Sequence, residues 1–139
     1  MKAITIKQPW AWAIVAGHKP IENRTWRTSY RGPLAIHAGK AKDLLDADYP
    51  AAWQDKFGTP WPPLRELRFG AVIGVVDLVD CLRIDRLPED LAGNPFAEGM
   101  YCWILDNPRP CAPIRCPGAQ QLWTPDDVTL AALQAAGPH

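Results

Sequence analysis

The fold is decided by a stretch in the middle of the chain that reads Gly70-Ala71-Val72-Ile73-Gly74-Val75-Val76-Asp77-Leu78-Val79-Asp80-Cys81. Its nearly continuous apolar run is typical of a strand that occupies a central position in a sheet. Glycines inside a strand often mark a bend, as where a strand turns the corner of a barrel. We therefore predict a long, bent central strand over residues 70–81.

Shorter extended segments lie on both sides of this strand along the chain. We predict strands or extended chain over residues 3–6, 19–26, 34–38, 100–105 and 114–123. The dipeptide Asn107-Pro108 predicts the end of the strand that begins at residue 100, because proline cannot donate to a sheet ladder.

Helices are predicted near the two ends of the chain and after the strand over residues 34–38. Pro9 suits a first helical position and Gly17 suits the residue after a helix end, so residues 9–16 form a short buried helix. Residues 40–57 are predicted to form one or two helices interrupted at Pro50, followed by a surface loop over residues 58–63. Thr124 precedes a proline and two aspartates, so we expect it to cap a last helix.

Length and composition fit one small domain. The chain has 139 residues, close to the typical size of about 150 residues for one domain. Its 15 prolines and 10 glycines argue against a bundle of long helices. We predict an α+β fold with a single domain over residues 1–139, built as a small, closed or nearly closed β-barrel with flanking short helices.

The composition also excludes several classes of protein. With 47% hydrophobic and 22% charged residues, the chain is neither disordered nor a coiled coil. No apolar stretch approaches the roughly 20 residues that cross a bilayer, and the first residues do not read as a signal peptide. We expect a soluble cytoplasmic protein with no membrane partner.

Charge is unevenly distributed along a chain whose net charge is zero. Residues 1–42 carry eight lysines and arginines against one acid, Glu22, whereas the remainder is acidic by the same margin. Such asymmetry favours a basic surface that faces a polyanion. The alternative is that the two parts of the chain pair with each other in the fold.

The four cysteines do not form a metal motif. Cys81, Cys102, Cys111 and Cys116 contain no pair with the CxxC spacing. We expect reduced thiols, with Cys81 and Cys102 as small core residues on strands. No carboxylate spacing demands a metal either, so we expect no metal site and no cofactor.

The stretch Gly17-His18-Lys19-Pro20-Ile21-Glu22-Asn23-Arg24 carries the main functional signal. Glu22 and Arg24 are two residues apart and share a face of an extended segment, and Lys19 reaches the same region through the turn at Gly17. A cation–anion–cation cluster of this kind can hold itself rigid while it leaves donors for an anionic ligand. The alternative interpretation is a salt-bridged surface strand.

These residues also resemble a known family. The pattern Gly-x-Lys-x-x-Glu-x-Arg, met by Gly17, Lys19, Glu22 and Arg24, resembles the core motif of the ASC-1 homology (ASCH) domain. The resemblance extends over roughly residues 3–124. It implies a PUA-like β-barrel with a helix against a cleft, and RNA or another nucleic acid as the first expected partner. Family members have been linked to transcription coactivation, RNA binding, ribonuclease activity and hydrolysis of acylated cytidine nucleosides, so the fold alone does not decide the activity.

The sequence departs from the amidohydrolase members of this family at one position. Those members place a threonine nucleophile three residues after the lysine, where this chain has Glu22. A carboxylate cannot act as that hydroxyl, and Thr25 points to the opposite face of an extended segment. An enzyme of this cleft would therefore use Lys19 and Glu22 as an acid–base pair.

Several further residues are candidates for ligand contact. The amides of Gln8 and Gln121 can pair with a base edge, Trp26 can stack on a base, Arg31 lies in the family's Arg-Gly element, and His37 can line the cleft. The alternative for Trp26 is packing in the barrel core, and for His37 a structural histidine. With Lys19, Glu22 and Arg24, these residues complete the expected ligand-binding set.

The function predicted from the sequence is a nucleic-acid-binding module that takes RNA or a modified nucleotide in a small basic cleft. The first alternative is a hydrolase that uses the same cleft, either an amidohydrolase acting on acylated cytidine or a ribonuclease. The second alternative is a protein-interaction module whose exposed tryptophans, such as Trp53 and Trp61, dock a protein partner.

Overall fold

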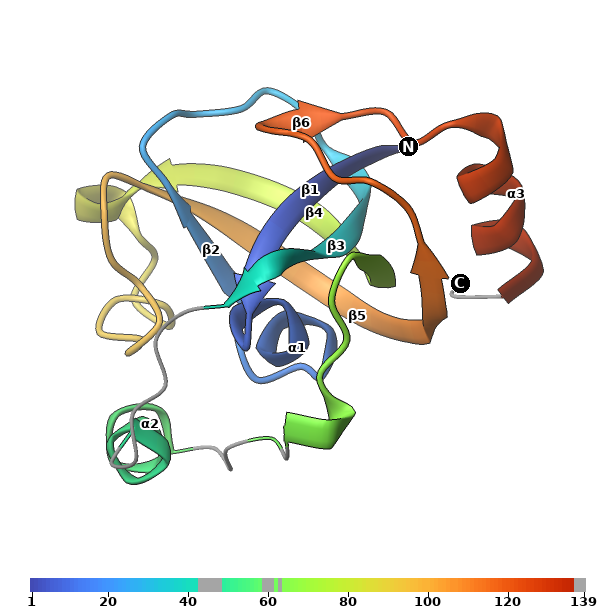
Figure 1. Ribbon diagram of the computed structural model, residues 1–139. Helices are drawn as coiled ribbons and strands as arrows, with labels where there is room; N and C mark the ends of the chain where they lie inside the picture. Colours follow the sequence, from blue (N-terminus) through green and yellow to red (C-terminus); the bar gives the residue numbers. More distant parts are fainter. Residues whose placement is uncertain (43–48, 59–61, 63, 137–139) are drawn as a thin grey trace.

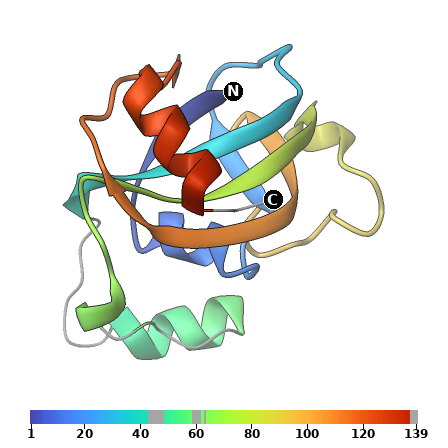
Figure 2. The same ribbon diagram turned by 90° about the vertical axis from the view of Figure 1, so that its right-hand side faces the viewer.

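The computed structural model describes residues 1–42, 49–58, 62 and 64–136 (Figure 1). In this part of the chain six strands form one curled sheet in the order β2-β5-β4-β3-β1-β6. The strands are β1 (Lys2–Gln8), β2 (Ile21–Arg24), β3 (Gly32–Lys42), β4 (Ala71–Arg83), β5 (Tyr101–Arg115) and β6 (Leu122–Trp123). The helices are α1 (Trp10–Val15), α2 (Tyr49–Phe57) and α3 (Asp127–Ala136), and 3₁₀ turns lie at Leu64–Glu66 and Ile84–Arg86. The α+β half-barrel confirms the predicted fold class (Figures 1 and 2).

Strand β4 is central, as its apolar run predicts. It pairs antiparallel with β3 on one side and with β5 on the other. The pairing with β5 shifts register between Val72 and Gly74. A Cβ atom added at Gly74 would lie 2.8 Å from the carbonyl oxygen of Arg109 and 2.9 Å from Cγ1 of Val15. Glycine is therefore required where the curled sheet brings β5 and α1 against β4.

The sheet is covered on both faces. Alternate residues of β1 and β3 point to opposite sides, so Ile4 and Ile36 pack with Ile14 of α1. Their neighbours Ala3 and Ala35 pack with Leu133 of α3 instead. Helices α1 and α3 thus lie on opposite faces, an arrangement that Figure 2 also shows.

A third apolar cluster joins α2 to the rest of the molecule. Trp53 of α2 is buried together with Ala13 of α1 and Phe96. Trp10 and Phe57 pack against this cluster and are half-buried. Helix α2 is therefore held by aromatic contacts with α1 and with the segment that precedes β5.

The prediction that Asn107-Pro108 ends a strand is wrong, because β5 continues from Tyr101 to Arg115. The register with β4 shifts between Val75 and Asp77, where the ladder accommodates the extra residues as a bulge. Asn107 adopts a positive φ of 52° there, and its side-chain amide donates to Oδ2 of Asp77 at 3.2 Å. A proline is tolerated at a bulge because no ladder hydrogen bond is needed from it.

Two of the predicted helix boundaries also need correction. Pro50 lies inside α2, in the first turn of the helix as described, where its missing N–H costs no hydrogen bond. Helix α3 is capped by Asp126, whose Oδ1 accepts the backbone N–H of Thr129 at 2.8 Å. The predicted cap, Thr124, accepts a hydrogen bond from Lys2 Nζ instead.

Residues 43–48 of the predicted helical region and most of the loop predicted at 58–63 lie outside the described residues. None of the described helices is long and apolar enough to span a membrane.

Candidate functional site

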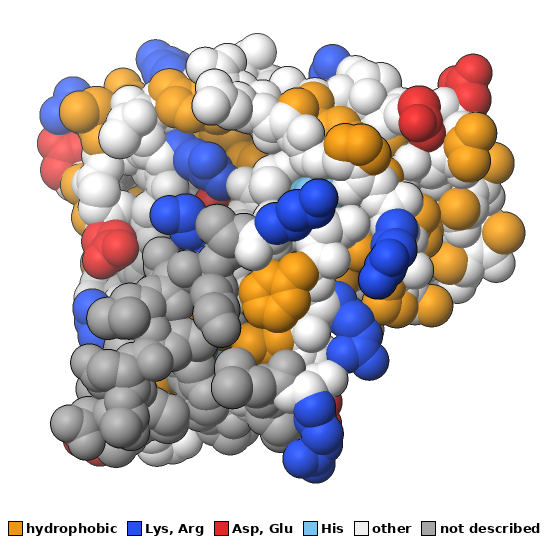
Figure 3. Space-filling view, in the orientation of Figure 1, with side chains coloured by type: hydrophobic (Ala, Val, Ile, Leu, Met, Phe, Trp, Pro, Cys, Tyr) orange, Lys and Arg blue, Asp and Glu red, His pale blue; other side chains and the backbone are white. Residues whose placement is uncertain are grey.

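A pocket of about 540 Å³ opens between β1, β2, α1, α2 and the segment before β5. The described residues that line it are Thr5, Ile6, Lys7, Trp10, Lys19, Glu22, Asn23, Arg24, Trp53, Lys56, Phe57, Pro95, Phe96 and Glu98. They include four cations and two carboxylates. On the face shown in Figure 3, Lys and Arg side chains lie across the middle, and Asp and Glu side chains lie mainly toward the edges.

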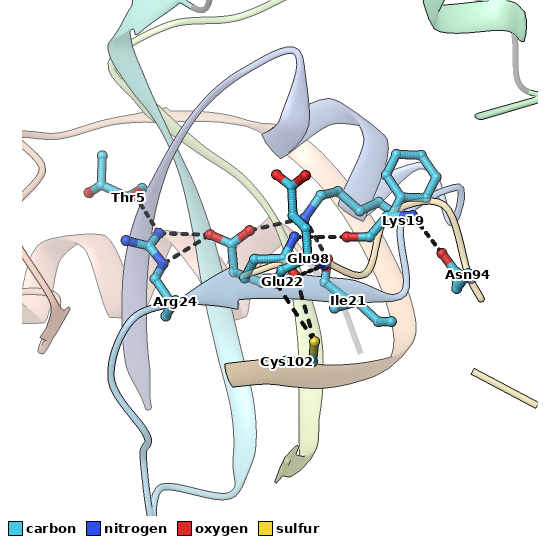
Figure 4. A network of polar contacts seen from close by, with 10 residues as sticks. Thr5, Lys19, Ile21, Glu22, Arg24, Asn94, Glu98 and Cys102 are labelled. Carbon is cyan, nitrogen blue, oxygen red and sulfur yellow. Dashed lines mark hydrogen bonds and ion pairs between the residues drawn. The ribbon is translucent and has the colours of Figure 1, made fainter. Parts of the chain in front are cut away.

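The expected cation–anion–cation cluster is present on the wall of this pocket. Strand β2 presents Glu22 and Arg24 on one face, and Lys19 reaches Glu22 from the turn before the strand (Figure 4). Lys19 Nζ lies 3.0 Å from Oε1 of Glu22 and also donates to the carbonyl oxygen of Ile21. Arg24 Nε and Nη2 lie 3.0 and 2.8 Å from Oε2 of Glu22. Each carboxylate oxygen of Glu22 therefore holds a different cation.

Burial makes this cluster rigid. The side chains of Lys19 and Glu22 are only 4% and 10% exposed, and charges so far from water need a partner. Arg24 is 24% exposed and also donates through Nη2 to the carbonyl oxygen of Thr5 at 3.2 Å. Among the described residues, the hydrogen bonds of the cluster use two N–H groups of Lys19 Nζ and the Nε and Nη2 groups of Arg24. The third N–H of Lys19 Nζ and the N–H groups of Arg24 Nη1 can therefore donate to a ligand.

His37 lies behind the pocket. It is 2% exposed and is absent from the described residues that line the cavity. Its Nε2 lies 2.7 Å from the carbonyl oxygen of Cys116, which can only accept, so Nε2 carries the proton. Nδ1 then accepts from the hydroxyl of Thr5 at 3.2 Å, and that hydroxyl in turn accepts from Trp123 Nε1 at 3.2 Å. His37 thus fixes Thr5, whose carbonyl holds Arg24.

The structure does not bring four other candidates to this pocket. Gln8 is buried, with its amide donating to the carbonyl of Arg68 and accepting from the N–H of Trp12. Trp26 packs edge-on against Trp103 with ring centroids 4.8 Å apart, which matches the core alternative. Arg31 donates to the carbonyls of Thr28 and Tyr30 and lies 3.5 Å from Asp80. Gln121 is exposed at a positive φ of 58°.

Aromatic residues form a wall of the pocket that the sequence motifs do not indicate. Trp10 and Trp53 lie 4.9 Å apart between centroids, and Phe57 stacks on Phe96 at 4.2 Å with an interplanar angle of 7°. Trp53 is 1% exposed, so the expectation that it docks a protein partner is wrong. Trp61 lies outside the described residues. Trp53 and Phe57 are four residues apart, so they share one face of a helix. This spacing is the sequence pattern that indicates an aromatic surface here.

The cysteines are free thiols in the described structure. Cys102 is buried on β5 as expected, and desolvation raises its pKa. Desolvation likewise raises the pKa values of Cys111 and Cys116, which keeps these thiols protonated at neutral pH. In the part of the chain that the structure describes, no group of three or more His, Cys, Asp or Glu side chains could hold a metal ion.

Comparisons with known proteins agree with this fold. The chain is 28% and 29% identical over 109 residues to Activating signal cointegrator 1 of Homo sapiens and of Mus musculus, which covers 76% of this chain and 19% of each relative. The chain therefore spans about a fifth of the length of these relatives. The crystal structure of ASCH from Zymomonas mobilis has a TM-score of 0.56 and 16% identity, over 96% of this chain and 93% of that chain. This likeness confirms the predicted PUA-like barrel.

The family model described as "ASCH domain" matches residues 4–115, a range that contains all of the described residues that line the pocket. The resemblance of the Gly-x-Lys-x-x-Glu-x-Arg motif is thereby confirmed. This chain belongs to the ASCH domain family, a family generally associated with RNA binding.

Proposed function

We propose that this protein binds single-stranded RNA and takes one nucleotide into the pocket beside Lys19, Glu22 and Arg24. The observation that carries the proposal is the buried cluster itself, in which one carboxylate holds two cations against a cavity. A volume of about 540 Å³ fits one small ligand and is too small for a duplex. Sequence-tolerant recognition of single strands combines such cations with aromatic surfaces.

The cations supply the contact with phosphate. Arg24 uses Nε and Nη2 for Glu22 and Thr5, so its Nη1 donors remain to meet a phosphate oxygen. Lys19 contributes a point charge from deeper in the pocket, and the exposed Lys7 and Lys56 add positive charge at the rim. Because Glu22 fixes the geometry in advance, little side-chain entropy is lost on binding.

The aromatic wall supplies the contact with the base. Trp10 and Phe57 are half-buried, so part of each ring is available to the cavity, whereas Trp53 and Phe96 pack behind them. Stacking of a base on such a ring is worth about 1–3 kcal/mol. A phosphate held by Arg24 and a base on this wall would together occupy the pocket.

The proposal is tested by fluorescence anisotropy with a labelled single-stranded RNA decamer. Binding should weaken with salt with a log–log slope between about −1.4 and −2.8, the value for two to four phosphate contacts with single strands. Arg24→Ala should bind about tenfold more weakly, and Arg86→Ala, an exposed cation outside the pocket, should bind like wild type. Binding that ignores salt, or equal losses in both variants, would contradict the proposal.

A further inference from the structure

The pocket contains one carboxylate that the proposed phosphate and stacking contacts do not use. Glu98 lines the cavity and is exposed at its rim. Both oxygens of Glu22 are occupied by Lys19 and Arg24. The carboxylate of Glu98, by contrast, makes no hydrogen bond or ion pair with the described residues (Figure 4). It is therefore the negatively charged group that the described pocket offers to a ligand.

The backbone that carries Glu98 is anchored to the cation cluster. The amide of Asn23, which lies between Glu22 and Arg24 on β2, accepts the backbone N–H of Glu98 at 3.0 Å and donates to the carbonyl of Phe96 at 2.8 Å. Asn94 Oδ1 accepts the N–H of Phe96 at 2.9 Å. These bonds hold Glu98 at a fixed place relative to the groups that would bind phosphate.

The chemistry of this carboxylate selects the kind of ligand group that can lie beside it. A carboxylate only accepts hydrogen bonds, so it repels phosphate and attracts N–H donors. The other charged groups that line the described pocket are cations, apart from the occupied Glu22. Base edges that carry N–H groups are the part of a nucleotide that fits Glu98.

We propose that Glu98 reads the donor edge of the base held in the pocket and that the pocket prefers guanine. This inference rests on the proposed binding of RNA. Guanine presents two adjacent donors, N1–H and the N2 amino group, which match the two oxygens of one carboxylate. Adenine and cytosine place a single amino group beside a ring acceptor. Uracil places its N–H between two carbonyl oxygens, which repel Glu98.

The test uses RNA pentamers in which only the central nucleotide carries a base and the four flanking nucleotides are abasic. Affinities for the guanine, adenine, cytosine and uracil pentamers are measured with wild type, Glu98→Gln, Glu98→Ala and Glu89→Gln. Glu89 is an exposed control that does not line the pocket and loses the same charge. Circular dichroism establishes that each variant is folded.

Wild type and Glu89→Gln should bind the guanine pentamer about fivefold to tenfold more tightly than the uracil pentamer, as expected for a two-bond contact at an exposed rim. Both Glu98 variants should reduce this preference to less than about twofold, and the uracil pentamer should bind them at least as tightly as it binds wild type, because the repulsion from the carboxylate is removed. Equal wild-type binding of the four pentamers, or a guanine preference that survives in both Glu98 variants, overturns the assignment of Glu98 alone. Failure of wild type to bind any pentamer overturns the RNA proposal together with it.

Discussion

Arg24 and Thr5 join two strands that are not neighbours in the sheet. Arg24 is the last residue of β2, and its Nη2 donates to the carbonyl oxygen of Thr5 in β1 at 3.2 Å. In the strand order β2 lies at one end, and β1 is followed only by the two-residue β6 at the other. The hydrogen bond therefore spans the open seam of the half-barrel, and the pocket lies at this seam.

We expect Arg24→Lys to separate the two roles of this arginine. A lysine keeps the positive charge but cannot reach Glu22, Thr5 and a ligand together, because it lacks the planar fork. RNA affinity should fall about threefold to tenfold, and the free energy of unfolding should fall by about 1–2 kcal/mol. Anisotropy and urea unfolding measure the two effects, and unchanged stability would show that the seam contact contributes nothing.

Glu22 is expected to position Lys19 and Arg24 and not to take part in a chemical step. Glu22→Ala leaves Lys19 buried without its carboxylate, so unfolding should become easier by about 1–3 kcal/mol. Glu22→Gln keeps the shape and an acceptor, so both the stability loss and the loss of RNA affinity should be smaller. Urea unfolding and RNA binding of both variants check this order.

The same variants decide between the binding module and the hydrolase. Turnover of acylated cytidine and of short RNA is measured for wild type and Glu22→Gln. We expect no turnover that depends on Glu22. If Glu22→Gln binds like wild type but loses a robust turnover by about 10²- to 10⁴-fold, the range for a missing general acid or base, then Glu22 is a catalytic residue and its positioning role is wrong.

Thr5 has two separate roles. Its hydroxyl should contribute to the stability of the fold, and its backbone carbonyl should hold Arg24 in place in the pocket. Thr5→Val removes the hydroxyl that contacts His37 and Trp123 but keeps the carbonyl that accepts from Arg24. The free energy of unfolding should fall by about 1–3 kcal/mol, because the buried His37 and the half-buried Trp123 both lose a hydrogen-bond partner. RNA affinity measured on the folded variant should stay within about twofold. A larger loss of affinity would place the hydroxyl in the binding site.

The cap of α3 gives a prediction that depends on pH. The N–H of Thr129 stabilises the ionised carboxyl of Asp126 and lowers its pKa. The contribution of Asp126 is therefore present above the ordinary aspartate pKa and is lost as the pH falls through the lowered value. At pH 7 Asp126→Ala should lower the thermal midpoint more than Asp127→Ala, and the difference between wild type and Asp126→Ala should shrink as the pH falls below the ordinary aspartate range. A difference that does not shrink on acidification would contradict the charged cap.

Local sequence patterns predicted the parts of the site that lie close together along the chain. Lys19, Glu22 and Arg24 fall within six residues. Alternation on the extended segment predicted that Glu22 and Arg24 share a face, and the turn at Gly17 predicted that Lys19 reaches the same region. The central position of β4 followed from its apolar run in the same way.

The outer wall of the pocket could not be predicted in this manner. Asn23 and Phe96 are hydrogen-bonded across 73 positions of sequence, and no local pattern indicates such a contact. Likewise, the turn signal of Asn107-Pro108 was overridden by the pairing of β5 with β4, which absorbs the dipeptide in a bulge. For His37, alternation along the strand predicts which face of the sheet the side chain lies on. It does not predict that the segment carrying Cys116 covers that face, and this segment keeps His37 out of the pocket.

The most direct test of the account is an NMR titration of the ¹⁵N-labelled protein with a single-stranded RNA hexamer. Binding in the pocket predicts the largest amide shift changes at Lys19, Asn23, Arg24 and Glu98, with little change in α3 on the opposite face of the sheet. Changes concentrated in α3, or spread over the surface without reaching the pocket, would contradict the claim that the seam between β1 and β2 is the nucleotide-binding site.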